Sequence, residues 1–165
     1  MIRLGGGGAA SPAPLTAWNT DYIAGNDGTP IHTDNTLSIF GIVIPAAIYF
    51  GNISISVVID DATHNYDFGL YNSAGHLIAN VGASKISATN VFTLPTLQGY
   101  QTIPAGLYWF ALTGVATTLD INQGLQIMWD FAINFGSSVG GVLPANISRA
   151  TPVPAQNVTP TFLLN

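Results

Sequence analysis

Residues 125–135 read LQIMWDFAINF, and an apolar side chain occupies every second position of this stretch. The apolar positions are Leu125, Ile127, Trp129, Phe131, Ile133 and Phe135. Successive side chains of a β-strand point to opposite faces, so the stretch would have one apolar face and one mostly polar face. A half-buried strand of this kind is typical of an antiparallel sheet. The pattern therefore predicts an all-β protein.

Further strand patterns follow one another at short intervals from residue 37 onward. The predicted strands are 39–44, 50–59, 66–71, 76–81, 90–94 and 107–113, with a brief pairing at 119–122. Glycine-containing turns are expected at 72–75 and 103–106, and loops at 60–65 and 136–141. Short strands separated by Gly and Pro turns are typical of an antiparallel β-sandwich or jelly roll. That is the predicted fold class.

The chain divides into three predicted parts. Residues 1–36 begin with a glycine run followed by AASPAP, which indicates an extended or irregular N-terminal arm, or alternatively a disordered tail. Residues 37–143 form the sandwich domain. Residues 144–165 are rich in proline and form an extended tail that closes a sheet edge or binds a neighbouring subunit. Within these arms, Trp18, Tyr22 and Phe162 are the predicted interface anchors.

The composition limits the possible partners. Of 165 residues only 7% are charged, against about 25% in ordinary globular domains. The eight acids are all Asp, and the three bases are Arg3, Lys85 and Arg149, for a net charge of −5. Binding to nucleic acid or to an anionic membrane surface is not expected, because both depend on clustered Lys and Arg. With no cysteine, disulfides and Cys-based zinc sites are excluded.

The mean hydropathy of +0.40 is high for a soluble monomer. The longest apolar run, residues 37–50, is interrupted by Pro45 and is shorter than the roughly 20 residues of a spanning helix. The N-terminal residues lack the apolar segment of a signal peptide. We therefore expect a subunit of a large assembly, with neighbouring subunits covering much of its surface.

Residues 136–140 read GSSVG and match the G-x-S-x-G nucleophile pattern. That motif works at a strand-to-helix turn, but the following GGVLP sequence cannot begin a helix, and no acid or histidine follows Ser138. The expected structure is a flexible loop between strands. Asp120 and Asp130 are the remaining candidates for a pair of catalytic carboxylates, and Asp130 lies on the polar face of its strand. No catalytic residue is predicted, and the chain is expected not to be an enzyme.

Metal binding is also not expected. His32, His64 and His76 lack the spacing of zinc ligands. Asp60, Asp61 and Asp67 lie near His64 in the sequence and could supply oxygen ligands to calcium. The segment 60–65 departs from the EF-hand pattern, however, and a solvated polar turn is the preferred interpretation. No cofactor is predicted. Among the aromatic residues, Tyr100 lies in a glycine-flanked loop and is the best candidate for stacking on a glycan.

Two segments carry a family resemblance. Residues 66–78 read YDFGLYNSAGHLI, and residues 103–112 read IPAGLYWFAL. Together they resemble small β-sandwich proteins of tailed-bacteriophage virions, found among capsid decoration proteins and tail or fibre head modules. The resemblance covers residues 50–113. It implies a non-enzymatic structural role, often as a trimer, and provides no catalytic residues.

The expected function is therefore that of a capsid decoration or cement subunit. Its expected partners are further copies of itself in a trimer and the major capsid protein or tail proteins. Its location would be the virion, assembled in the reducing cytoplasm of the host, which agrees with the missing cysteines. Two alternatives remain open: a tail or fibre head module that binds a host-surface glycan, and a free carbohydrate-binding module.

Overall fold

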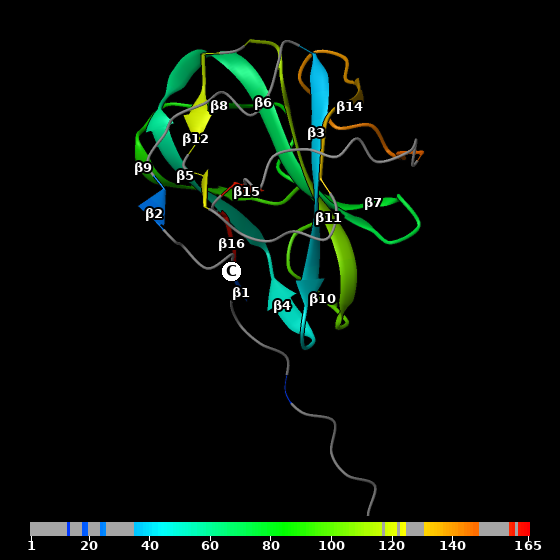
Figure 1. The fold of residues 1–165 in the computed structure, drawn as a ribbon. Coiled ribbons are helices and arrows are strands. Elements are labelled where there is room, and N and C mark those ends of the chain that lie inside the picture. The colour runs from blue at the N-terminus through cyan, green and yellow to red at the C-terminus, as the bar shows by residue number, and fades with distance from the viewer. Residues whose placement is uncertain are drawn as a thin grey trace, which may run out of the picture.

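The computed structural model describes residues 13, 18–19, 24–25, 35–116, 118–121, 123–124, 131–148, 159–160 and 162–165. These residues contain no helix, and every pairing between their strands is antiparallel (Figure 1). Consequently no helix in this part of the chain is long and apolar enough to span a membrane. The prediction of an all-β fold with antiparallel sheets is confirmed.

The larger sheet has six strands in the order β14-β3-β11-β6-β7, with β8 also paired to β6. Their bounds are β3 Thr36–Ile44, β6 Asp61–Asn72, β7 Leu77–Asn80, β8 Ser84–Ile86, β11 Gly106–Gly114 and β14 Phe131–Ser137. Strand β14 occupies the end of the stretch that first indicated an all-β protein, and residues 125–130 lie outside the described residues.

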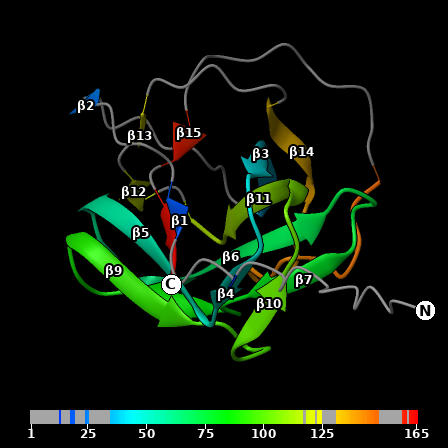
Figure 2. The same ribbon diagram turned by 90° about the horizontal axis from the view of Figure 1, so that it is seen from below.

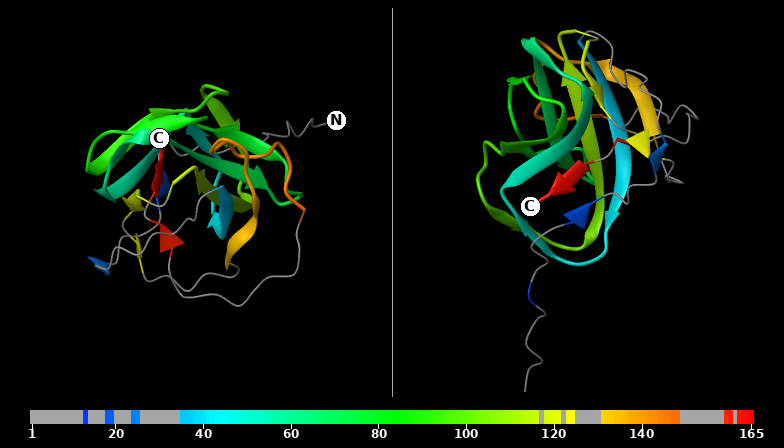
Figure 3. Two further views of the ribbon diagram at one scale, coloured as in Figure 1. Left: turned by 90° about the horizontal axis from the view of Figure 1, so that it is seen from above. Right: turned by 90° about the vertical axis from the view of Figure 1, so that its left-hand side faces the viewer.

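The second sheet has five strands in the order β1-β16-β5-β12. β16 and β12 pair with successive parts of one edge of β5, and β9 pairs with its opposite edge. Their bounds are β1 Trp18–Asn19, β5 Asn52–Ile59, β9 Asn90–Pro95, β12 Asp120–Ile121 and β16 Phe162–Leu164. Segments from near the two ends of the chain therefore lie side by side, because β1 pairs with β16 (Figure 3). A separate three-stranded sheet joins β2 Ala24–Gly25, β13 Gln123–Gly124 and β15 Thr159–Pro160.

Strands β4 Ile48–Phe50 and β10 Gln101–Ile103 pair with each other at one end of the molecule (Figures 1 and 2). They continue the pair β3–β11, because Ile44 lies opposite Gly106 and Ile48 lies opposite Ile103. The prediction of a chain-reversing turn at 103–106 is therefore wrong. Pro104 and Ala105 interrupt one long bent strand opposite a similar break at 45–47, where Pro45 cannot donate a ladder hydrogen bond.

The main core lies between the two large sheets. The six-stranded sheet contributes Phe40, Ile42, Phe68, Leu70, Phe110 and Leu112, and the five-stranded sheet contributes Ile53, Ile55, Val57, Ile121 and Leu164. These side chains alternate along their strands with residues of the opposite faces, as packing of two sheets requires. The two sheets thus pack face to face as a β-sandwich.

A second apolar cluster covers the outer face of the six-stranded sheet. It consists of Leu37, Ile39, Tyr71, Trp109, Ala111 and Leu143, with Leu77 and Ile147 packed against it. Because β3 and β11 contact apolar side chains on both faces, their sequences are almost continuously apolar, as in other strands buried on both sides. The hydroxyl of Tyr71 donates a hydrogen bond to the carbonyl of Pro144 at 2.6 Å, which fixes residues 143–147 over this face.

Candidate functional site

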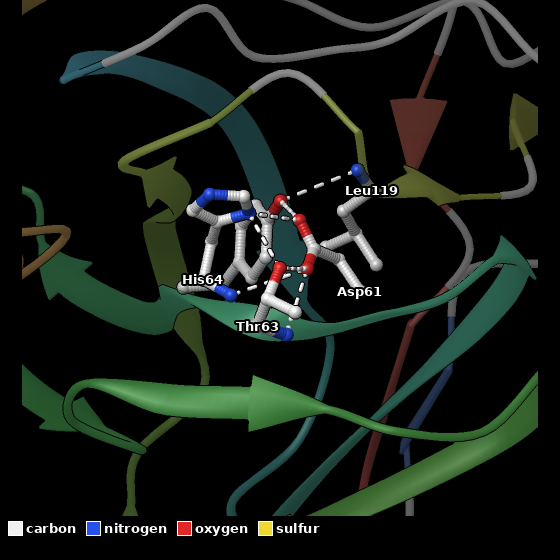
Figure 4. Close-up of polar contacts among 5 residues, drawn as sticks. Asp61, Thr63, His64 and Leu119 are labelled. Atoms are coloured by element: carbon white, nitrogen blue, oxygen red, sulfur yellow. Dashed lines mark hydrogen bonds and ion pairs between the residues drawn. The ribbon is translucent and has the colours of Figure 1, made fainter.

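The densest group of polar contacts centres on the buried carboxylate of Asp61 (Figure 4). One carboxylate oxygen, Oδ1, accepts hydrogen bonds from the Thr63 hydroxyl at 2.6 Å and from the backbone N–H groups of Thr63 and His64. The other, Oδ2, accepts from the Tyr66 hydroxyl at 2.7 Å and lies 2.7 Å from His64 Nδ1. Since an ionised carboxylate only accepts, this last contact places a hydrogen on Nδ1.

This cluster stabilises an irregularity in the sheet. Strand β6 pairs with β8 at Asp61 and again at Tyr66, and the register shifts between these two positions. The intervening residues bulge away from the ladder, so their backbone N–H groups need other acceptors. The Asp61 carboxylate accepts from two of them. The prediction of a loop at 60–65 is therefore wrong from Asp61 onward, because the polar residues belong to a bulged strand.

The same contacts determine the protonation of the cluster. Burial alone would raise the pKa of Asp61, but the hydrogen bonds from Thr63, Tyr66 and His64 outweigh it, so the pKa lies well below its usual range. Burial, together with the bond to Asp61, raises the pKa of Tyr66. His64 forms its hydrogen bonds through Nδ1 and its backbone N–H. Among the described residues, no nucleophilic side chain forms a hydrogen bond with the other ring nitrogen, Nε2. These contacts indicate that Asp61 and His64 have a structural role in the bulge.

The other residues considered as catalytic or metal-binding candidates lie apart from the Asp61 cluster. Ser138 is buried directly after β14, where its hydroxyl oxygen forms a hydrogen bond with the Thr113 hydroxyl at 2.6 Å, and Gly140 and Gly141 then form a tight turn. The loop expected at 136–141 thus begins after Ser137. Asp120 is buried beside β5, whereas Asp130 and His32 lie outside the described residues. In the part of the chain that the structure describes, no three His or acidic side chains come close enough to share a metal ion.

Two exposed tyrosines, Tyr49 on β4 and Tyr100 just before β10, stack their rings on each other, and we call this pair the tyrosine platform. Tyr49 is 46% exposed and Tyr100 is 63% exposed. Their rings are inclined by only 25°, with centroids 5.4 Å apart. Asn52 Nδ2 donates a hydrogen bond to the Tyr100 hydroxyl at 3.2 Å, so the phenolic hydrogen of Tyr100 points elsewhere.

The position of Tyr100 depends on a glycine. A Cβ atom at Gly51 would lie 2.6 to 2.7 Å from three carbon atoms of the Tyr100 ring, so the ring rests directly on the backbone of Gly51. The two residues lie opposite each other, one position beyond the Phe50–Gln101 pair of β4 and β10. An aromatic ring that covers a glycine on the neighbouring strand stabilises the pairing of the strands.

The loop before Tyr100 is held by a chain of hydrogen bonds that starts in the core. The fully buried carboxylate of Asp67 accepts from Asn80 Nδ2 and from the backbone N–H groups of Gly82 and Leu143, each at 2.8 to 2.9 Å. Asn80 Oδ1 accepts from Gln98 Nε2, and Gln98 Oε1 accepts from Asn80 N. Burial raises the pKa of Asp67, although the three N–H donors act in the opposite direction. The platform is therefore supported by an ordered loop.

The predicted anchors are only partly located. Strand β1 pairs Trp18 with Leu164, and β16 pairs Phe162 with Ile55, so the structure brings these two backbone segments together in one sheet. Tyr22 lies outside the described residues. The structure places the fourth predicted site residue, Tyr100, on the surface beside Tyr49. That partnership was missed because it depends on the register between β4 and β10, for which the sequence of either strand gives no signal.

Comparisons with protein-family models, with curated proteins and with solved structures find no match to this chain.

Proposed function

We propose that this protein is a non-enzymatic structural subunit of a tailed-bacteriophage virion, with a capsid decoration or cement role as the leading assignment. In this role it would stabilise the shell by protein–protein contacts, and it would act as a homo-oligomer, with a trimer as the expected state. The sequence resemblance in residues 66–78 and 103–112 motivates the assignment to virions.

The supporting structural observation is the apolar character of the exposed surface. Val43 and Leu107 lie directly opposite each other on β3 and β11, and they are 53% and 42% exposed. Other large apolar side chains are exposed on β5, β9 and the 139–142 turn. Scattered apolar residues are normal on a protein surface, but here they accompany a content of charged residues far below average. Burial of such a surface against other subunits would be favourable.

The first test is the position and copy number of the chain in intact particles, measured by cryo-electron microscopy. A decoration subunit would be present in many copies distributed over the shell. Absence of the chain from all particle fractions would overturn the proposal. Removal of residues 1–34 tests the predicted arm, and the deletion should stop there because Asn35 N donates a hydrogen bond to Gly114 O and Thr36 begins β3. A decoration role that depends on the arm predicts loss of particle binding by this variant. Because the deletion also removes β1, which pairs with β16, circular dichroism has to show that the sandwich is still folded.

A tail or fibre head module is the second candidate, and the tyrosine platform is the observation that favours it. Exposed aromatic rings on a rigid support are suited to ligand recognition. A few copies at the tail, in place of many on the shell, would select this candidate.

A further inference from the structure

We infer that the tyrosine platform is a binding site for a neutral pyranose sugar, which would place its C–H face against an exposed ring face of the Tyr49–Tyr100 stack. This inference goes beyond the structural role proposed above and does not depend on where the chain lies in a particle.

The shape of the site matches one face of a sugar ring. The two phenol rings stack on each other with their centroids 5.4 Å apart, and both are substantially exposed, so the stack offers a flat apolar ring face to a ligand. The axial hydrogens of a pyranose carry partial positive charge and are attracted to the negative face of an aromatic ring. A flat ligand with polar groups at its rim would therefore cover the platform without burying its own hydroxyls.

The rim of the platform offers hydrogen bonds of the kind that sugar hydroxyls need. The Tyr100 hydroxyl accepts from Asn52, and its own hydrogen has no acceptor among the described residues. The described residues likewise provide no partner for the Tyr49 hydroxyl, and the exposed Thr102 lies opposite Tyr49 across the strand pair. A purely apolar protein surface would leave these hydroxyls without partners, at a cost in free energy. A saccharide would satisfy them.

The charge of the surrounding chain indicates that the sugar is neutral. Residues 35–59 and 86–119, which include both strands of the platform and the loop before Tyr100, contain no Asp, Glu, Lys, Arg or His. Recognition of a carboxylated or sulfated sugar normally uses Arg or Lys, which pair with the anionic group. These segments offer no such cation.

The support of the platform reduces the cost of binding. Tyr100 rests on Gly51, and the loop before it is tied to the buried Asp67 through Asn80 and Gln98. Thr96 N also donates to Gly51 O, which joins the loop to β4. Since the rings already occupy their positions in the free protein, little side-chain entropy is lost when a ligand binds. A weak but specific site of small area is the expected result.

The test is an NMR titration of the full chain labelled in its tyrosine rings. The probes are maltotriose, cellotriose, lactose and chitotriose, with sialyllactose as the charged comparison. We expect saturable shifts of the Tyr49 and Tyr100 ring signals with at least one neutral probe, and no gain in affinity from the sialic acid. Tyr49→Ala should weaken binding about tenfold or more, which corresponds to the loss of one stacking contact. Val91→Ala, which removes an exposed apolar side chain on β9, should leave the affinity unchanged.

Because Tyr100→Ala uncovers Gly51 and could unfold the β4–β10 pair, Tyr49→Leu is the second variant. It retains an apolar side chain but removes the ring, and we expect it to bind as weakly as Tyr49→Ala. Absence of saturable shifts with every neutral probe would overturn the inference, as would an affinity that Tyr49→Ala leaves unchanged. Ring shifts that depend on protein concentration, combined with dissociation of an oligomer by Tyr49→Ala, would identify the platform as a subunit interface and also overturn it. None of these results would alter the copy number in particles, so the two proposals can fail separately.

Discussion

The carboxylate of Asp67 accepts a hydrogen bond from the side-chain amide of Asn80 at 2.8 Å, in the interior of the six-stranded sheet. Asn80 in turn binds Gln98, two positions before Tyr100. A buried acid on β6 thus supports a loop at the surface. The backbone N–H of Leu143 donates to the same oxygen of Asp67, and it belongs to the segment that covers the outer face of the same sheet. Asp67 therefore connects the core, the platform and the outer cluster.

Asp67→Asn should lower the free energy of unfolding by about 2 kcal/mol. The amide keeps the shape of the carboxyl group, but its nitrogen would face at least one buried N–H donor that the carboxylate now satisfies. Urea unfolding followed by circular dichroism measures the change. Asp60→Asn is the matched control, because Asp60 is exposed and its substitution should alter stability by less than about 0.5 kcal/mol. Equal effects of the two substitutions would refute the proposed network.

The Asp61 cluster predicts a specific pH dependence of stability. The pKa of Asp61 lies below its ordinary value of 3.8 in the folded protein, so the folded state favours the ionised form. This contribution is present above the ordinary pKa and disappears as the pH falls through the lower folded value. Asp61→Asn should cost about 1 to 3 kcal/mol at neutral pH. The difference between wild type and variant should then shrink below about pH 4.

The measurement is a series of urea unfolding curves for both proteins from neutral to acidic pH. Asp60→Asn is again the control, and its difference from wild type should show little dependence on pH. A difference for Asp61→Asn that stays constant, or grows, on acidification would contradict the assignment of an ionised carboxylate to the bulge.

The strands were predictable from sequence where apolar side chains alternate regularly or form a continuous run. The alternation at 50–59 and 107–113 corresponds to β5 and β11, and the apolar run 39–44 belongs to β3. Residues 60–65 were mistaken for a loop because their polar composition is the same in a loop and in a bulged strand. Local composition does not reveal that the Asp61 carboxylate replaces the missing ladder partners.

The candidate site was predictable only in part, because it also depends on contacts between distant parts of the chain. Tyr100 stands out in the sequence because Gly99 precedes it, and Gly99 does have a positive φ of 69°. Tyr49 becomes its neighbour only through the pairing of β4 with β10, which are far apart in the chain. The apolar residues Trp109 and Ala111 likewise gave no indication that Leu143 would cover them. Contacts of this range depend on topology, and no short segment specifies topology.

Leu143→Ala should destabilise the protein by about 2 to 4 kcal/mol. Leu143 is only 4% exposed and packs in the outer cluster, so truncation leaves a cavity between the 143–147 segment and the sheet. Val139→Ala is the control in the preceding turn, where the side chain is 87% exposed and should contribute little. Thermal and urea unfolding provide the comparison. If both variants unfolded like the wild type, the 143–147 segment would not be part of the cooperative fold.

Gly51→Ala should displace the Tyr100 ring while the sandwich stays folded. The new Cβ would overlap the ring at 2.6 Å, and the ring can yield because Tyr100 lies at the surface. The loss of this cross-strand contact should cost about 1 kcal/mol or less. The ring signals of Tyr49 and Tyr100 should shift in the NMR spectrum, and sugar binding, where the wild type shows it, should weaken in this variant. Gly106→Ala is the matched control, since a Cβ there meets Tyr108 at an ordinary 3.6 Å. Unchanged Tyr100 signals in Gly51→Ala would mean that the ring does not rest on Gly51 in solution, and the preorganised platform would have to be abandoned.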